Sequence, residues 1–258
     1  MEDDEIMRLI DLSVYTEENP YAEAFPPVIK FVPHQEEAKI LSKKMGVDVS
    51  VFPDGCALSH EDVVGSFHIG THVDAPLHFG PVVAGQKARG IDQMPLEWFF
   101  QDGVRLDLRH IPPKALITKD HIIAALAEIK YTLKPLDIVL LWTGFDKFIY
   151  EPKYLAEQPG MSREATEYLL DRGIKVIGID CWGFDRPFAV QAEEIKKGNL
   201  GALFPGHFIG REKEYCHIEK LGNLDQLPVP YGFKVAAFPQ KVRNGTAGAA
   251  RVVAILED

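Results

Sequence analysis

The 258-residue sequence contains only three cysteines, Cys56, Cys181 and Cys216. Their number is odd and no two of them form a Cys-x-x-Cys pair. Neither a disulfide framework nor a thiolate zinc site is therefore indicated, and we expect three free thiols.

Long hydrophobic runs are also missing. The continuous apolar run Ile138–Trp142 is far shorter than the ~20 residues of a membrane-spanning helix. Residues 1–5 read Met-Glu-Asp-Asp-Glu, whereas a signal peptide begins with positive charge. We therefore expect a cytoplasmic protein that does not enter a membrane.

The chain lacks an excess of basic residues. It has 28 Lys and Arg against 38 Asp and Glu, which gives a net charge of −10. A protein that binds nucleic acid or an anionic membrane surface would need a basic patch. Small-molecule substrates are the partners that this composition favours.

Several common catalytic signatures are absent as well. The sequence contains no G-x-S-x-G, G-x-G-x-x-G, G-x4-G-K or H-E-x-x-H pattern. These patterns mark serine hydrolases, dinucleotide-binding proteins, P-loop proteins and zinc peptidases, respectively. Each of those classes is therefore disfavoured.

What the chain does have is a cluster of polar ligand residues. Three of its nine histidines, His68, His72 and His78, lie in eleven positions together with Asp74. By chance about 0.4 histidines would fall in such a window. This excess needs a functional cause.

An extended chain suits this segment better than a helix. A helix would put His68 and His72 on one face but would turn Asp74 and His78 nearly to the other, whereas a period of two puts alternate residues on one side. Four residues of straight strand span about 13 Å, so the chain must bend between His68 and His72. Gly70 can supply that bend, because it adopts positive φ without steric cost.

The chemistry of these groups predicts a metal centre. Imidazole nitrogen and carboxylate oxygen are ligands for zinc or manganese, and three ligands from His68, His72 and Asp74 would leave a coordination position open for water. An open position indicates catalysis. His78 would be either a fourth ligand or a general acid/base. The alternative is that these histidines only form hydrogen bonds within a polar loop.

This motif, H-x-G-T-H-x-D-x-P-x-H, resembles the signature of the metal-dependent cyclase-like hydrolases, which include bacterial kynurenine formamidase and isatin hydrolase. The resemblance extends to Ile10–Ser13, to Gly178–Asp180 and to a late His and Glu, and so covers most of the chain. It implies that His68, His72 and Asp74 bind a divalent metal, one or two ions of Zn²⁺ or Mn²⁺, and that His78 moves protons. It also implies a swivelling β/β/α arrangement and a homodimer or homotetramer.

The late His and Glu are His207 and Glu219. From the sequence alone, Glu219 would be interpreted as a residue in the first turn of a helix, where the helix dipole favours it. The resemblance instead implies that His207 and Glu219 complete the metal centre, and we count Glu219, with His78, among the catalytic residues. His217 is expected to be only a neighbour.

Length and a hydrophobic content of 46% predict one α/β domain over residues 1–258, with a mixed sheet and flanking helices. The clearest unit is Asp137–Asp180, where two apolar strands, 138–142 and 175–179, are joined through a helix capped by Ser162 and ended by Gly173. Such strands are expected to lie parallel in one sheet, with functional groups at their carboxyl ends. Further elements are expected as strands at 7–14, 104–108, 233–238 and 249–256, helices at 34–44 and 118–129, and a turn at 245–248.

Several other residues leave alternatives open. Asp180 could hold a ligating imidazole by a hydrogen bond or could cap the next turn. His34 is expected at the surface or at a helix cap rather than in a pocket, and His60 is unassigned. Trp182 and Phe184 could form an apolar wall for a substrate, and the loop 80–90 could shape or cover a pocket.

We therefore expect a metal-dependent hydrolase that cleaves a small amide, as an arylformamidase cleaves N-formylkynurenine. The metal would activate a water molecule and polarise the carbonyl, and His78 would pass the proton to the departing nitrogen. A hydrolase of a cyclic amide or lactone would need the same centre. A protein of another class, which binds a small molecule through the metal without turnover, would use a closed coordination sphere instead.

Overall fold

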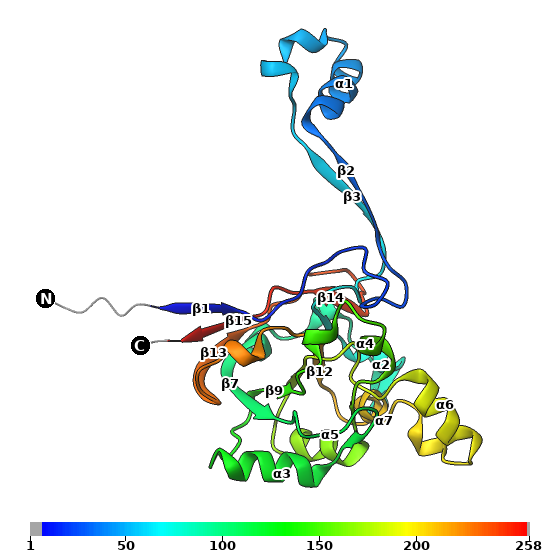
Figure 1. Ribbon diagram of the computed structural model, residues 1–258, viewed down its shortest axis with the longest axis vertical. Coiled ribbons are helices and arrows are strands. Elements are labelled where there is room, and N and C mark those ends of the chain that lie inside the picture. The colour runs from blue at the N-terminus through cyan, green and yellow to red at the C-terminus, as the bar shows by residue number, and fades with distance from the viewer. Residues whose placement is uncertain (1–6, 257–258) are drawn as a thin grey trace, which may run out of the picture.

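The computed structural model describes residues 7–256, so the acidic segment 1–5 lies outside the described residues. Within them, nine strands form one mixed sheet (Figure 1). The predicted α/β fold with a mixed sheet and flanking helices is thereby confirmed. From one edge to the other the strands are β1 (Arg8–Asp11), β15 (Val253–Leu256), β13 (Tyr231–Ala236), β7 (Phe100–Asp107), β9 (Ile138–Trp142), β11 (Val176–Ile179), β12 (Cys216–Glu219), β4 (His72–Asp74) and β14 (Ala247–Ala249).

The centre of the sheet is parallel. β7, β9, β11 and β12 run in the same direction, and Val176 of β11 lies opposite Ile138 of β9. The predicted parallel pairing of these two apolar strands is confirmed. Every residue of β9, β11 and β12 is buried, as expected for strands covered on both faces.

Antiparallel strands flank the centre and curl the sheet. β14 and β15 belong to opposite flanks, yet only residues 250–252 separate them. The four Cα–Cα steps from Ala249 to Val253 span at most about 14 Å, so the two flanks must approach each other. The space inside the curl is filled by a hydrophobic cluster that includes Leu12, Phe99, Ile218 and Leu224.

This curl corrects one expectation. We predicted a single strand at 249–256 after a turn at 245–248. The chain instead turns at Asn244, which has φ 54°, and is already a strand at Ala247, opposite Asp74. The predicted strand is broken because the chain must cross from one flank of the sheet to the other.

Helices cover the outer face of the sheet. α3 (Lys119–Glu128) and α5 (Arg163–Leu170) pack on it, at the bottom of Figure 1, through a cluster that includes Ile122, Leu169 and Ile177. Both have the predicted N-caps, since the side chains of Thr118 and Ser162 accept hydrogen bonds from the first turns. The other helices are α1 (His34–Met45), α2 (Pro76–Phe79), α4 (Lys153–Ala156), α6 (Phe188–Lys196) and α7 (Pro205–Phe208).

The expected helices at 34–44 and 118–129 are confirmed. The helix after Ser162 ends at Leu170, two residues earlier than expected, and Gly173 beyond it has φ 81°.

Three short pairs of strands lie outside the large sheet: β2 (Val28–Val32) with β3 (His60–Val64), β5 (Val82–Val83) with β6 (Gln86–Lys87), and β8 (Leu116–Ile117) with β10 (Gly160–Met161). Within residues 7–256 there is no helix long and apolar enough to cross a membrane.

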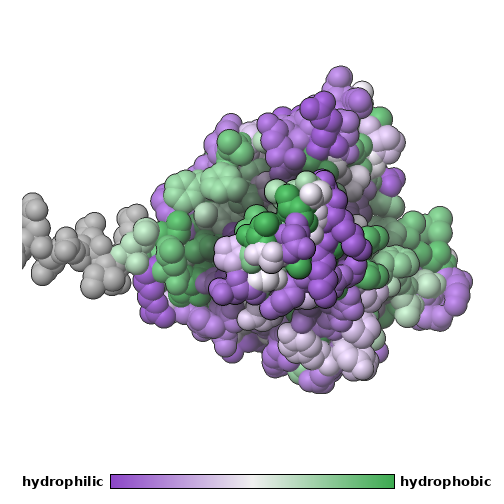
Figure 2. Space-filling model, turned by 90° about the horizontal axis from the view of Figure 1, so that it is seen from above, coloured by the Kyte–Doolittle hydropathy of each residue, from purple (hydrophilic) through white to green (hydrophobic). Residues whose placement is uncertain are grey.

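An arm projects from the body of the molecule (Figure 1). It consists of the β2–β3 hairpin with α1 at its far end, and all five residues of β3 are exposed. Several exposed side chains of the hairpin are large and apolar, among them Phe31 (68% exposed) and Val64 (72% exposed). Figure 2, which looks down on the arm, shows such apolar surface between hydrophilic residues.

Candidate metal centre

Two neighbouring strands form the core of the site. β4 carries His72 and Asp74, β12 carries His217 and Glu219, and the antiparallel register sets His217 opposite Asp74 and Glu219 opposite His72. Alternate residues of a strand point to the same face. All four side chains therefore meet, with His217 Nε2 3.0 Å from Asp74 Oδ2 and His72 Nε2 3.6 Å from Glu219 Oε2.

The segment before and after β4 adds two more imidazoles. Gly70 has φ 56°, so the predicted bend between His68 and His72 is confirmed. It brings His68 Nδ1 to 2.8 Å from Asp74 Oδ1. His78, on the short helix α2, has its Nε2 3.7 Å from Asp74 Oδ2.

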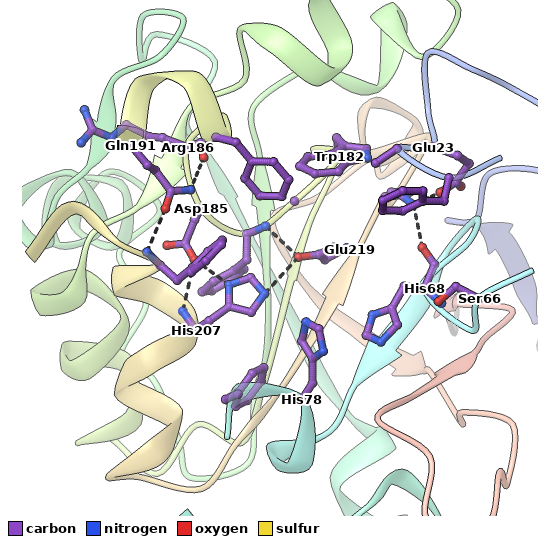
Figure 3. A pocket seen from close by; sticks show the side chains of 18 of the residues that line it. Glu23, Ser66, His68, His78, Trp182, Asp185, Arg186, Gln191, His207 and Glu219 are labelled. Carbon is purple, nitrogen blue, oxygen red and sulfur yellow. Dashed lines mark hydrogen bonds and ion pairs between the residues drawn. The ribbon is translucent and has the colours of Figure 1, made fainter. Parts of the chain in front are cut away.

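His207 approaches from α7. Its Nε2 lies 3.7 Å from Glu219 Oε1 and 3.9 Å from Asp74 Oδ2. In Figure 3 the rings of His68, His78 and His207 form a row below Glu219. The structure thus brings together all six residues that were predicted from the motif and the resemblance: His68, His72, Asp74, His78, His207 and Glu219.

The helix interpretation of Glu219 was wrong. Glu219 is the last residue of strand β12, and its Oε1 accepts a hydrogen bond from the backbone N–H of Phe184 at 2.8 Å. Strand geometry, rather than the start of a helix, therefore points this carboxylate at the cluster.

His217 lies inside the cluster and not merely beside it, as we had expected. Its ring is held between the aromatic rings of Phe79 and Phe184, with ring centres 5.1 and 4.4 Å away. The sequence contained a signal for it, because His217-Ile-Glu219 has the same spacing as His72-Val-Asp74. Two such pairs on adjacent strands face one another.

Asp185 is a second residue that sequence analysis missed. Its Oδ2 lies 2.6 Å from Nδ1 of His207. A carboxylate in this position holds a proton on Nδ1, so the lone pair of Nε2 points towards Asp74 and Glu219. No local pattern could have revealed this contact, because it depends on packing α7 against the segment after β11.

The orientation of His72 shows that the cluster suits a cation. Nδ1 of His72 lies 2.9 Å from the carbonyl oxygen of Gly70 and so carries the proton, which leaves a lone pair on Nε2. Nε2 of His72 and Oδ1 of Asp74 are both buried, and neither makes a hydrogen bond of good geometry among the described residues, although His68 Nδ1 lies 2.8 Å from Asp74 Oδ1. Buried polar atoms without partners are costly, and a divalent metal between them would satisfy both.

Apart from His72, whose Nε2 lies 3.3 Å from Asp74 Oδ1, the ligand atoms fall into two groups that share one carboxylate. Among the described residues, Asp74, His207, His217 and Glu219 form one group and His68, Asp74 and His78 form the other. Within each group the atoms lie within 4.8 Å of one another. Nitrogen and carboxylate donors suit zinc or manganese, and a shared Asp74 is compatible with one ion or with two.

The charges also favour a cation. Burial alone would raise the pKa of Glu219, but the hydrogen bond to His217 and the nearby imidazoles lower it to about 2. Burial alone would lower the pKa of His217, but the hydrogen bonds to Asp74 and Glu219 raise it to about 9. The two carboxylates thus draw positive charge to the centre. Burial lowers the pKa of His78 to about 4, and the attraction of Asp74 offsets only part of this effect.

A pocket of about 420 Å³ opens onto the cluster (Figure 3). Trp182 and Phe184 are part of its wall, as predicted, and His68, His78, His207 and Glu219 reach into it. The segment 80–90 does not line this pocket but forms the β5–β6 hairpin. The lining contains further aromatic side chains, Phe25, Phe79, Phe188, Phe204 and Phe208, and also the charged residues Glu23, Asp185, Arg186 and Lys220.

The remaining candidates lie elsewhere. Asp180 accepts hydrogen bonds from the backbone N–H groups of Thr143 and Gly144, so it caps the turn after β9 and does not hold an imidazole. His34 and His60 are exposed residues of the arm, and Nδ1 of His34 lies 2.6 Å from the carbonyl oxygen of Ala57. The three cysteines are free thiols, as predicted.

Comparison with known proteins identifies relatives of this chain. It is 28% identical to an isatin hydrolase from Roseibium aggregatum over 200 residues, which cover 73% of this chain and 72% of that protein. The structure resembles that of an isatin hydrolase bound to the product analogue thioisatinate, with a TM-score of 0.75 and 24% identity, covering 98% of this chain and 93% of that one. It also resembles the structure of a predicted metal-dependent hydrolase from Bacillus stearothermophilus, with a TM-score of 0.65 and 22% identity, covering 97% and 98%.

A family model agrees with these likenesses. Residues 10–186 match the model of the Cyclase family, described as "Putative cyclase". This range contains the motif from His68 to His78 as well as the parallel strands β7, β9 and β11. Because the match spans well over half of the sequence, the chain belongs to the Cyclase family.

Proposed function

We propose that this Cyclase-family metal-dependent hydrolase cleaves the C–N bond of a small aromatic amide. The single observation that carries the proposal is the meeting of a buried His and carboxylate cluster with an aromatic pocket of about 420 Å³. The cluster offers a place for a metal and for acid–base groups. The pocket offers a flat apolar substrate a surface to stack on.

In this proposal each of the six predicted residues has a role. One or two divalent ions, Zn²⁺ or Mn²⁺, would be held by His68, His72, Asp74, His207 and Glu219. When bound, such an ion lowers the pKa of a water molecule to about 7 and polarises the amide carbonyl.

His78 is the general base and acid. Among the six predicted residues it is the most exposed, and its Nε2 lies 3.7 Å from Asp74 Oδ2 at the edge of the pocket. It takes a proton from the attacking water and returns it to the departing nitrogen. Glu219, with its Oε1 3.7 Å from His207 Nε2, is the second catalytic residue, because its charge balances the positive charge of the centre.

The substrate class has two candidates with the same chemistry. One is an open-chain aryl formamide such as N-formylkynurenine, and the other is a cyclic amide such as isatin. The name of the Roseibium relative favours the cyclic amide.

Turnover of defined substrates tests this proposal. We expect purified protein loaded with Mn²⁺ or Zn²⁺ to hydrolyse isatin faster than N-formylkynurenine and simple lactones, measured as the change in ultraviolet absorbance. Faster cleavage of N-formylkynurenine would assign an arylformamidase. Metal binding without turnover of any of these compounds would favour the metal-dependent binding protein.

We propose in addition that the chain assembles into a homodimer or homotetramer, as the resemblance implies. The arm supports this proposal. A two-stranded hairpin is at best marginally stable alone in water, and Phe31 and Val64 leave large apolar surfaces exposed on it. A second copy of the chain could cover both arms at once through a two-fold interface.

The arm proposal predicts a change of assembly. Phe31→Asp puts a charge where the apolar contact would form, so we expect the variant to sediment as a smaller species than the wild-type protein in analytical ultracentrifugation. Lys30→Ala, at the neighbouring exposed position, is the control and should leave the assembly unchanged. A wild-type protein that sediments as a monomer would contradict the proposal.

A further inference from the structure

A buried ion pair lies beside the metal cluster. Lys220, which follows Glu219 directly, is only 2% exposed, and its Nζ lies 2.6 Å from Oε2 of Glu23, which is 6% exposed. Both residues line the pocket, and Glu23 lies on the same side of it as His68 (Figure 3). Withdrawing two charges from water is costly unless each of them finds further partners.

Those further partners belong to the metal-binding motif. Nζ of Lys220 donates a hydrogen bond to the backbone carbonyl oxygen of His68 at 2.9 Å. Oε1 of Glu23 accepts one from the backbone N–H of Gly70 at 2.8 Å. The ion pair therefore holds the bend between His68 and His72 at two points.

The backbone of the bend is closely surrounded by neighbouring residues. Gly70 has φ 56°, and a Cβ atom there would come within 2.7 Å of Oγ1 of Thr16. Lys220 itself has φ 58°, in a region that side chains other than glycine rarely occupy. Its carbonyl oxygen accepts a hydrogen bond from Oγ1 of Thr71 at 2.5 Å, which ties it again to the motif.

The orientation of the bend sets the orientation of His72. The carbonyl oxygen of Gly70 accepts the Nδ1 proton of His72 at 2.9 Å. The peptide groups on both sides of Gly70 are thus fixed, one by Glu23 and the other by His72. A shift of the Gly70 backbone would turn the His72 ring and move His68 away from Asp74.

We propose that Glu23 and Lys220 are positioning residues whose ion pair fixes the bend at Gly70 and so directs His68 and His72 to the metal. They do not touch the metal themselves. Loss of partners that hold metal ligands in place typically weakens metal binding by about 10- to 100-fold. This inference rests on the proposed metal-dependent function.

Three variants and one control test the ion pair. Lys220→Asn removes the ammonium group, and asparagine tolerates a positive φ better than most residues. Glu23→Gln keeps an acceptor for Gly70 but removes the charge, and Lys220→Arg keeps the charge. The control is Glu214→Gln, since Glu214 pairs with Arg89 before the start of β12, away from the cluster.

Two measurements are made on metal-free protein. Calorimetric titration with Mn²⁺ or Zn²⁺ gives the metal affinity, and hydrogen exchange gives the protection of the Gly70 amide. We expect Lys220→Asn and Glu23→Gln to weaken metal binding about 10- to 100-fold and to speed exchange at Gly70. Lys220→Arg should recover part of both effects, and Glu214→Gln should change neither.

Wild-type metal affinity and wild-type Gly70 exchange in a folded Lys220→Asn protein would overturn the inference. If Lys220→Asn does not fold, the same two measurements on Glu23→Gln decide. A wild-type protein that binds neither ion would contradict the proposed function, whereas Gly70 exchange in the metal-free variants would still test the ion pair.

Discussion

Asp74→Asn is expected to abolish metal binding and turnover together. Among residues 7–256, Asp74 alone belongs to both ligand groups of the cluster, and it is 1% exposed. The nearby histidines hold its pKa well below the usual range despite its burial, so the carboxylate is ionised. The amide keeps the shape of the side chain but removes the negative charge that a dication requires.

The measurement is metal content by elemental analysis, together with the initial rate on the best substrate. We expect metal affinity to fall by more than the roughly 100-fold that the loss of an outer partner can cost, because a direct ligand is lost. The matched control is Asp137→Asn. Asp137 is also buried, at 2% exposed, but it directly precedes β9 and accepts a hydrogen bond from the hydroxyl group of Tyr131 there.

The two variants separate the roles of a buried carboxylate. If Asp137→Asn lowers the melting temperature but keeps metal and rate, the loss in Asp74→Asn is specific to the centre. An Asp74→Asn protein that still holds wild-type amounts of metal would contradict the assignment of Asp74 as a shared ligand.

The sequence predicted the half of the site that is local along the chain. His68, His72 and Asp74 are close in sequence, so an extended chain with a bend at Gly70 was enough to bring them together. The φ of 56° at Gly70 agrees with that argument. Once the segment is taken as an extended chain, the few bonds between these residues leave little freedom in their relative positions.

The other half depends on which strand lies beside β4, and the local sequence does not contain that information. His217 and Glu219 reach the centre because β12 pairs with β4 in one register. A shift by one residue would turn both side chains to the other face of the sheet. The resemblance to the family predicted that Glu219 and His207 belong to the site. No feature of the sequence predicted the contacts of Asp185, Glu23 or Lys220.

In the fold, too, the local elements could be predicted and the long-range arrangement could not. The apolar strands β9 and β11 and the capped helices α3 and α5 were predicted well, because periodicity and capping act within a few residues. The curl of the sheet was not predicted. It follows from the proximity of β14 and β15, which only the complete set of strand pairings determines.

His78→Ala is expected to keep the metal but to lose most of the turnover. A group that moves a proton in the transition state typically contributes about 10²- to 10⁴-fold to the rate. His78 lies at the rim of the pocket, and the centre of its ring is 4.2 Å from the centre of the His68 ring. Burial lowers the pKa of His78 to about 4. Its imidazole is therefore neutral near pH 7 and can accept a proton.

This variant tests metal binding as well as proton transfer, because His78 also belongs to one of the two ligand groups. Metal content and rate must therefore be measured on the same sample. Added imidazole should restore part of the rate, because His78 lines the pocket and loss of its ring leaves room for the added ring. Loss of metal together with rate would make His78 a ligand. An unchanged rate with unchanged metal would exclude it from both roles and would leave the proton transfer to His207 or Glu219.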